Sequence, residues 1–339
     1  MPRLTLIAVL GAALLYAGQR VQLRVDDAQA RAVLAIVHAR RAGESVDSAA
    51  WARLFSSEPY RRLAQREASL RRPFTEEAFR EFVVGGDLAS RADHLRRTLE
   101  SWRSRDLQPS ARRVLAYLPA EARIRATVYP VIKPQSNSFV FDVRGDPAIF
   151  LYVDPAQSAE AFENTVAHEL HHIGFASVRS SADSLLAGLP ERSRTAAEWM
   201  GAFGEGFAML AAAGGPDLHP HASSPPEERA RWDRDIANFA TDLRELETFF
   251  LDIVDGRLTS DADVNARGYG FFGVQGPWYT VGYRMAVIVE ERFGRDVLIE
   301  CMLDPRRILA RYNEAVAAFG DAASLPRWSP RLLRAIGVG

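Results

Sequence analysis

Residues 148–172, AIFLYVDPAQSAEAFENTVAHELHH, combine an apolar run, a turn and a helical pattern in direct succession. The apolar run Ala148–Val153 is typical of a buried β-strand, because it is short and bounded by turn residues. Asp154 and Pro155 follow it and predict the N-cap and first position of a helix that continues to Phe175. The stretch therefore predicts a strand that leads directly into a helix.

The end of that stretch, HELHH, fits the H-E-x-x-H pattern of zinc hydrolases. His168 and His172 are four residues apart, which on a helix means about 40° of rotation and one turn of rise, so both imidazoles point at one place. Glu169 lies about 100° from His168 and can reach a water molecule without binding the metal. The spacing predicts Zn²⁺ at the two histidines, with Glu169 as the general base.

A zinc site needs a third ligand, and Glu205 is the strongest candidate. It lies on the next helical segment, predicted over Thr195–Ala213, among apolar residues that leave a carboxylate in need of a partner. Gly201, Gly204 and Gly206 surround it. Because glycine costs helix stability, three glycines beside one carboxylate indicate close approach of another backbone.

Other zinc schemes fit the chain less well. A metzincin needs glycine and histidine at the places held by Phe175 and Val178. His219 and His221 lie in a loop rich in glycine, proline and serine and stay open as alternative ligands. His171 is interpreted as a packing residue or a support for a ligand, because the pair spaced by four is the better match.

The remaining pattern is helical before residue 119 and mixed after it, which predicts an α+β fold. We expect a helical region over residues 19–119 and a zincin-like catalytic domain over 120–339, with Ala148–Val153 as the edge strand along which an extended substrate lies. The other expected strands are Arg123–Ile132 and Ser138–Val143, and the expected helices are Ala28–Arg40, Ser48–Phe55, Pro59–Arg71, Thr75–Val84, Asp87–Ser104, Glu227–Val254, Pro277–Phe293, Pro305–Phe319 and Pro330–Ile336.

Composition narrows the classes of protein. The formal net charge is −1, so no basic field attracts nucleic acid. Arg3 precedes the apolar run Leu4–Ala17, which predicts a signal peptide over residues 1–18 and export to the periplasm or the extracellular space, with an uncleaved anchor as the alternative. Cys301 is the one cysteine, so no intramolecular disulfide forms.

Four segments together resemble an uncharacterised bacterial family of zinc-dependent peptidases of gluzincin type. They read WARLFSSEPYRRL, HELHHIG, EGFA and GPWYTVGYRMAVIVEERFG. The resemblance implies a peptidase fold with ligands at His168, His172 and Glu205 and a base at Glu169. Thermolysin-like enzymes carry an aspartate four residues after the ligand glutamate, where this chain has Met209, so another group, such as Glu198, is expected to support the ligands.

The predicted function is hydrolysis of peptide bonds in a peptide or protein substrate by zinc-activated water. A hydrogen-bond donor must also stabilise the oxyanion, and Tyr279 and Tyr283 share one face of a predicted helix. Arg284 is assigned instead to a substrate carboxylate or a core ion pair. Two alternatives stay open: a zinc-binding protein without catalysis, and a zinc amidase that acts on a non-protein amide.

Overall fold

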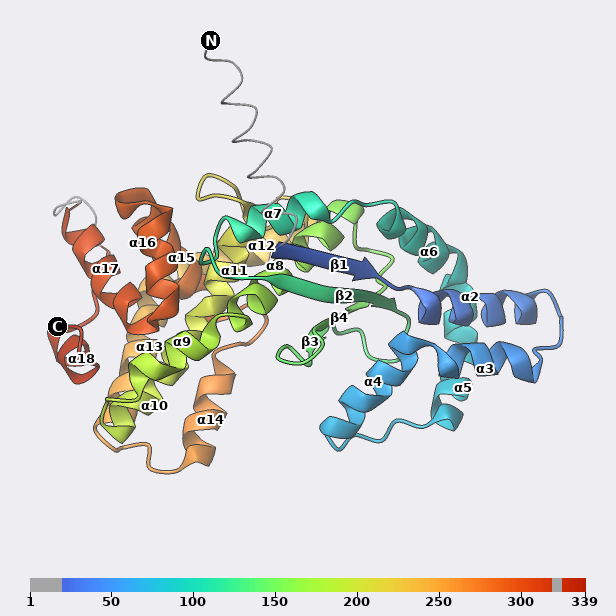
Figure 1. The fold of residues 1–339 in the computed structure, drawn as a ribbon, viewed down its shortest axis with the longest axis horizontal. Coiled ribbons are helices and arrows are strands. Elements are labelled where there is room, and N and C mark those ends of the chain that lie inside the picture. The colour runs from blue at the N-terminus through green and yellow to red at the C-terminus, as the bar shows by residue number, and fades with distance from the viewer. Residues whose placement is uncertain (1–19, 319–324) are drawn as a thin grey trace, which may run out of the picture. The chain divides into compact units, whose positions relative to one another are not determined.

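A computed structural model describes residues 20–318 and 325–339, and these are mainly helical with one four-stranded sheet (Figure 1). The expected α+β class is confirmed. The predicted signal peptide lies outside the described residues. No helix in the described ranges combines the length and the apolar character that crossing a membrane requires.

Contacts between residues divide the chain into two compact units. Unit 1 comprises the residues up to Arg112 and Arg123–Ile173, and unit 2 comprises Arg113–Ala122 and Gly174–Gly339. The predicted domain boundary near residue 119 stays a prediction, and the compact units are divided elsewhere. The reason is visible in the sheet of unit 1, which takes strands from both sides of that boundary.

The sheet of unit 1 has the strand order β1-β2-β4-β3. Strand β1 (Val21–Val25) pairs in parallel with β2 (Ile124–Val131), and β2 pairs in parallel with β4 (Ala148–Tyr152). Strand β3 (Phe139–Phe141) is antiparallel to β4. The sequence analysis did not predict β1, although Val21–Val25 alternates between apolar and polar residues. Its pairing partner β2 lies about a hundred residues further along the chain, so a local pattern does not show the pairing.

The predicted role of Ala148–Val153 as an edge strand is wrong. Strand β4 lies between β2 and β3, whereas β1 and β3 form the two edges of the described sheet. An uninterrupted apolar run is the signature of a strand covered on both faces and both sides. Four of the five residues of β4 are buried, which agrees with that central position.

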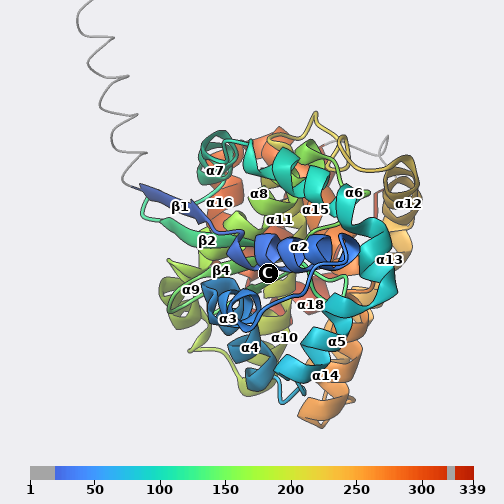
Figure 2. The ribbon, with the colours of Figure 1, turned by 90° about the vertical axis from the view of Figure 1, so that its right-hand side faces the viewer.

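The five helices expected before residue 119 are all present, with ends that shift by a few residues. Figure 2 looks onto this group. The N-terminal helices of unit 1 are α2 (Ala28–Arg41), α3 (Ser48–Ser56), α4 (Glu58–Ser69), α5 (Glu76–Val84) and α6 (Gly86–Arg103). Helix α7 (Gln108–Leu115) follows them.

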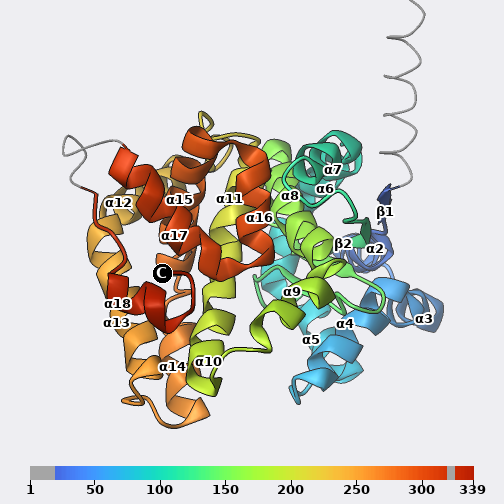
Figure 3. The ribbon, with the colours of Figure 1, turned by 60° about the vertical axis from the view of Figure 1, so that its left-hand side comes forward.

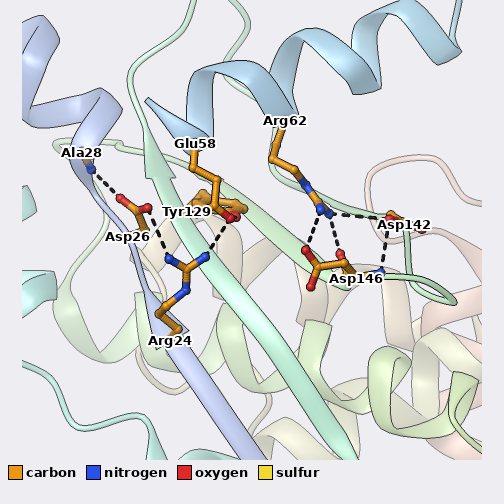
Figure 4. Close-up of polar contacts among 8 residues, drawn as sticks. All are labelled: Arg24, Asp26, Ala28, Glu58, Arg62, Tyr129, Asp142 and Asp146. Carbon is orange, nitrogen blue, oxygen red and sulfur yellow. Dashed lines mark hydrogen bonds and ion pairs between the residues drawn. The ribbon is translucent and has the colours of Figure 1, made fainter. Parts of the chain in front are cut away.

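Helix α4 is attached to the sheet by polar contacts at its N-terminal half (Figure 4). The carboxylate of Glu58 accepts hydrogen bonds from the Tyr129 hydroxyl at 2.6 Å and from the Arg24 guanidinium at 2.7 Å. These two donors hold the pKa of Glu58 below its ordinary value. One turn later, Arg62 donates to Asp146 at 2.7 Å, at the turn before β4. The contacts fix one helix over strands β1, β2 and β4.

Helix α8 (Ala159–Ala176) follows β4, but it begins later than predicted. The Asp154 carboxylate accepts from the backbone N–H of Ala156, two residues on, and so forms a local turn instead of a helix cap. The Ser158 hydroxyl accepts from the Ala161 N–H and takes the capping place. Within unit 1, Phe162 on α8 stacks on Trp102 of α6 with ring centroids 4.5 Å apart.

Unit 2 is helical (Figure 3). The segment predicted as one helix over Thr195–Ala213 is three pieces, α10 (Glu191–Met200), the 3₁₀ turn η1 (Gly201–Phe203) and α11 (Gly204–Ala213). The segment Glu227–Val254 is likewise two helices, α12 (Pro226–Ala237) and α13 (Phe239–Val254). The other helices are α9 (Arg179–Leu186), α14 (Asp261–Gly270), α15 (Pro277–Phe293), α16 (Arg295–Leu303), α17 (Pro305–Ala318) and α18 (Pro330–Ala335).

Helix α15 forms the centre of unit 2 and packs against α11, α13, α16 and α17. Its Trp278 is fully buried and donates to the Gly268 carbonyl at 2.8 Å. Near its C-terminal end, Glu290 accepts from Tyr117 and from Arg295, at 3.1 and 2.8 Å, which attaches the Arg113–Ala122 segment to this helix. Helix α15 is therefore the central helix on which α11, α13, α16 and α17 pack.

Candidate metal centre

His168 and His172 converge as their spacing predicts. Both are half-buried on α8, and their Nε2 atoms lie 3.0 Å apart, with ring planes at 77°. Two nitrogen ligands at about 2.0–2.1 Å from a tetrahedral zinc ion lie roughly 3.3 Å from each other. The side chains therefore already stand within a few tenths of an ångström of the separation that zinc requires.

Glu205 completes a group of three side chains that could hold a metal ion. One ligand atom each of His168, His172 and Glu205 lies within 4.8 Å of the others. Two imidazoles and one carboxylate are a donor set of catalytic zinc sites, in which a fourth position stays open for water or substrate. The residues present thus fit zinc by the chemistry of their donor atoms.

The residues next to the two histidines on α8 differ in exposure. Glu169 is half-buried, whereas His171 is almost fully buried, with its ring centroid 6.2 Å from that of His172. Such a position agrees with the interpretation of His171 as a residue that packs beside a ligand. The role of Glu169 as a general base stays a prediction.

Glu205 lies in the first turn of α11, where this helix packs on α15 with almost no space between the backbones. A methyl group added at Gly206 would lie 2.0 Å from the backbone nitrogen of Tyr283. One added at Gly282 would lie 2.7 Å from the Phe203 carbonyl oxygen. The predicted close approach is confirmed at Gly206, and the backbone that it meets is that of Gly282 and Tyr283.

Gly201 and Gly204, the other two glycines near Glu205, lie in open space. A methyl group at Gly201 or Gly204 would meet no heavy atom within 4 Å. The prediction that all three glycines near Glu205 serve close packing is therefore wrong for these two. Both lie at or next to the 3₁₀ turn that interrupts the expected helix, so they accompany a break in the helix instead.

The two tyrosines of α15 are placed differently. Tyr283 is buried, its hydroxyl donates to the Leu218 carbonyl at 3.3 Å, and burial raises its pKa to about 12. Tyr279 is half-buried in the first turn of the helix, and its ring lies 6.5 Å from that of Phe272. The hydroxyl of Tyr283 already has an acceptor in unit 2, and that contact was not visible in the sequence.

His219 and His221, the alternative ligands, form part of a folded loop. His219 Nε2 lies 2.9 Å from an Asp233 carboxylate oxygen, and His221 Nδ1 lies 2.9 Å from the Ser224 hydroxyl. Burial, followed by the charges of His219 and Arg231, lowers the pKa of His221 to about 4. These contacts give both histidines structural partners within unit 2.

Glu198 and Arg284 are both exposed. Glu198 lies on α10, separated from the helix of Glu205 by the 3₁₀ turn, and its carboxylate pairs with Arg194 at 3.9 Å. The two glutamates therefore do not share one uninterrupted helix, and the support of the ligands by Glu198 stays a prediction. The exposure of Arg284 rules out a core ion pair, whereas its assignment to a substrate carboxylate stays a prediction.

Comparison with protein families gives one match. The family model described as "Putative zinc dependent peptidase (DUF5700)" matches residues 51–318, which is most of the chain and includes His168, His172 and Glu205. A comparison with curated proteins and another with solved structures gave no match.

Proposed function

The chain belongs to this family, and we propose that it hydrolyses peptide bonds with zinc held by His168, His172 and Glu205. The observation that carries the proposal is the group of three ligand atoms within 4.8 Å, formed by the residues that the H-E-x-x-H pattern and the downstream glutamate predict. Zinc, when bound, supplies Lewis acidity that makes water a nucleophile at neutral pH and polarises the scissile carbonyl.

Glu169 is proposed to move the proton. Glu169 lies next to His168 on α8 and is half-buried, so it is partly accessible to solvent. Its side chain leaves the helix about 100° away from the direction of His168. In the proposed step, a carboxylate oxygen of Glu169 takes a proton from the attacking water and then delivers it to the leaving amine nitrogen.

The edge of the unit 1 sheet that is formed by β3 supports binding of an extended peptide. Strand β3, at that edge, is only three residues long, and Phe139 and Phe141 pack towards α4 under the guanidinium groups of Arg66 and Arg62. A substrate strand that adds to β3 gains main-chain hydrogen bonds without needing a particular sequence. We therefore propose β3, not β4, as the strand along which substrate lies.

A developing oxyanion needs a donor besides the metal. Tyr279 and Tyr283 remain the proposed candidates. The Tyr283 hydroxyl is directed to the Leu218 carbonyl, so it must exchange that partner before it can serve a substrate. If either hydroxyl serves the oxyanion, the corresponding variant, Tyr279→Phe or Tyr283→Phe, should lower kcat/KM while its zinc content stays unchanged.

The function is tested by Glu169→Gln in zinc-loaded protein, assayed against a peptide library. The amide cannot accept the proton, so kcat/KM is expected to fall about 10²–10⁴-fold while zinc content and thermal stability stay unchanged. Glu160→Gln, an exposed glutamate on the same helix, is the matched control and should turn over normally. Equal turnover by the Glu169 variant and the parent would remove Glu169 from catalysis, and absence of hydrolysis in the parent would favour a zinc-binding protein.

Export is proposed from the N-terminal segment alone. Arg3 followed by the apolar run Leu4–Ala17 has the composition of a signal peptide. Cell fractionation with N-terminal sequencing of the recovered protein tests it. A cytoplasmic protein that retains Met1 would contradict export.

A further inference from the structure

Arg231, on α12 in unit 2, is a half-buried arginine with an unusual set of partners. Its Nη2 reaches the Gln275 side-chain oxygen only at 3.5 Å, and its Nε is buried without a hydrogen bond. Across residues 20–318 and 325–339, no ion pair joins Arg231 to a carboxylate. A guanidinium group that loses water in this way normally gains a carboxylate in return.

Other half-buried arginines of the chain follow that rule. Arg62 pairs with Asp146 at 2.7 Å, Arg295 with Glu290 at 2.8 Å, and Arg306 with Asp304 at 2.8 Å. Their positive charges are balanced where they are buried. Arg231 differs from them by the absence of a carboxylate, not by its depth.

Partners for Arg231 are available along its own helix. Glu227 and Asp235 lie four residues before and after it, at the spacing from which ion pairs form on a helix. The arginine side chain uses neither and is directed to Gln275, at the start of α15. The fold therefore holds the guanidinium away from these two carboxylates.

Nearby groups do not pair with the guanidinium either. His221 lies close enough for Arg231 to help lower its pKa to about 4, so its ring is neutral at neutral pH. The carboxylate of Asp233 lies 2.9 Å from His219 Nε2 and forms no ion pair with Arg231. The described residues thus leave Arg231 without a direct carboxylate partner, beside the neutral side chains of His221 and Gln275.

The two loops that meet Arg231 and Trp232 expose apolar side chains. Leu218, three residues before His221, is 53% exposed, and Val274, next to Gln275, is 69% exposed. Gln275 has φ = 62°, a left-handed conformation that is strained for a residue with a side chain and that collects at functional sites. Exposed apolar side chains around a guanidinium group that lacks an ion pair are typical of a surface that binds a ligand with both charged and apolar parts.

We propose that Arg231 binds a carboxylate of the substrate peptide, and that Leu218 and Val274 contact apolar side chains beside it. A guanidinium group forms paired N–H···O bonds with a carboxylate, so this place should prefer a peptide that carries a negative charge. Contacts within unit 2 connect this place to Glu205: Trp232 lies 5.3 Å from the Tyr283 ring, and the Tyr283 backbone abuts Gly206. The identification of the ligand as substrate rests on the proposed peptidase function.

The proposal is tested by measuring peptide binding, so that the result does not depend on hydrolysis of the peptide. Zinc-loaded Glu169→Gln protein is titrated with three apolar peptides: one with a free C-terminal carboxylate, one amidated, and one amidated with a glutamate added. We expect the affinity for the amidated apolar peptide to be at least roughly tenfold lower than the affinity for at least one of the two peptides that carry a carboxylate. The comparison of those two peptides shows whether Arg231 binds a C-terminal carboxylate or a glutamate side chain.

Arg231→Gln in the same background should abolish that preference, and Arg231→Lys should restore part of it. Arg229→Gln and Arg234→Gln, two exposed arginines of the same helix, are matched controls and should keep it. Equal affinity for all three peptides, or an unchanged preference in Arg231→Gln, would overturn the proposal, and so would the same loss in the controls. Thermal unfolding of each variant shows that it is folded, and parent protein that hydrolyses no peptide would refute the peptidase proposal alone.

Discussion

The two helices that carry the proposed zinc ligands obtain their geometry in different ways. On α8, one helical repeat brings the Nε2 atoms of His168 and His172 to 3.0 Å, with both ligands on a single element. On α11, Glu205 is placed by the neighbouring helix α15, whose Gly282 and Tyr283 backbone lies against Gly206. The first arrangement needs only a formed helix, whereas the second needs correct packing between residues about 76 positions apart along the chain.

The difference implies that the two parts of the site respond differently to substitution. Changes near α8 act on the metal directly through the loss of a ligand. Changes near α11 act through the distance between two helices, because a packed interior does not absorb an extra methyl group without movement.

The largest effect is expected from removal of a ligand on α8. His172→Ala leaves His168 and Glu205, too few ligands for tight zinc binding, and affinity should fall by more than the roughly 10–100-fold that loss of a supporting partner costs. Zinc content after dialysis and competition with a chelator measure it. Because His172 is half-buried, the helix should still form, and far-ultraviolet circular dichroism should be unchanged. Full retention of zinc would mean that another side chain, such as His219 or His221, takes its place.

A smaller but more informative effect is expected at Gly206. In Gly206→Ala the new methyl group meets the Tyr283 nitrogen at 2.0 Å, so α11 and α15 must move apart, at a cost of about 1–3 kcal/mol in the free energy of unfolding. Glu205, the preceding residue, moves with its helix, and zinc affinity should fall as well. The d–d spectrum of the Co²⁺-substituted protein reports whether the ligand geometry has changed.

Gly204→Ala is the matched control for that variant. It also adjoins Glu205, but its methyl group has open space, so stability should stay level or rise by up to about 1 kcal/mol because alanine favours helix. Zinc affinity should stay at the parental value. If Gly204→Ala and Gly206→Ala lower zinc affinity alike, packing on α15 does not place Glu205.

The loop that packs on α15 should make stability depend on pH. The pKa of His221 is lowered to about 4, below its ordinary value near 6.5, chiefly by burial and further by His219 and Arg231. The unfolded chain therefore takes up a proton that the folded chain refuses, and the free energy of unfolding falls as pH drops from about 6.5 towards 4.

His221→Asn removes that dependence, since asparagine does not titrate. Denaturant unfolding at pH 7.5 and at pH 4.5 should show a smaller loss of stability in the variant than in the parent, with His38→Asn, an exposed histidine, as control. A parallel loss in parent and His221→Asn would mean that the buried ring does not contribute.

The smallest effect is expected from Tyr283→Phe. The variant loses the hydrogen bond from its hydroxyl to the Leu218 carbonyl, worth about 0.5–1.5 kcal/mol and here at the low end because the contact is 3.3 Å long. Zinc affinity should hardly change, since the backbone contact with Gly206 is kept. A large fall in zinc affinity would show that the loop, and not only the glycine contact, positions α11.

The local features of the proposed site follow from the amino-acid pattern alone. His168, Glu169 and His172 follow from the period of a helix, and the C-terminal end of α11 at Gly214 follows from glycine, which adopts φ = 97° there without strain. The five helices between Ala28 and Arg103 were also predictable, because each carries an apolar face with its own period, whereas α7 (Gln108–Leu115) was not predicted. Glu205 was identified from its apolar neighbours and from the glycines beside it.

Features that depend on partners far apart in the chain could not be predicted from local patterns. Strand β1 exists because it pairs with β2, and β3 lies at the edge because β4 inserts between it and β2. The break between α10 and α11, the contact of Gly206 with Gly282, and the direction of Arg231 away from Glu227 and Asp235 have the same origin. Periodicity reports which face of an element is buried, but the free energy that selects the partner on that face comes from packing and hydrogen bonds between segments far apart in the chain.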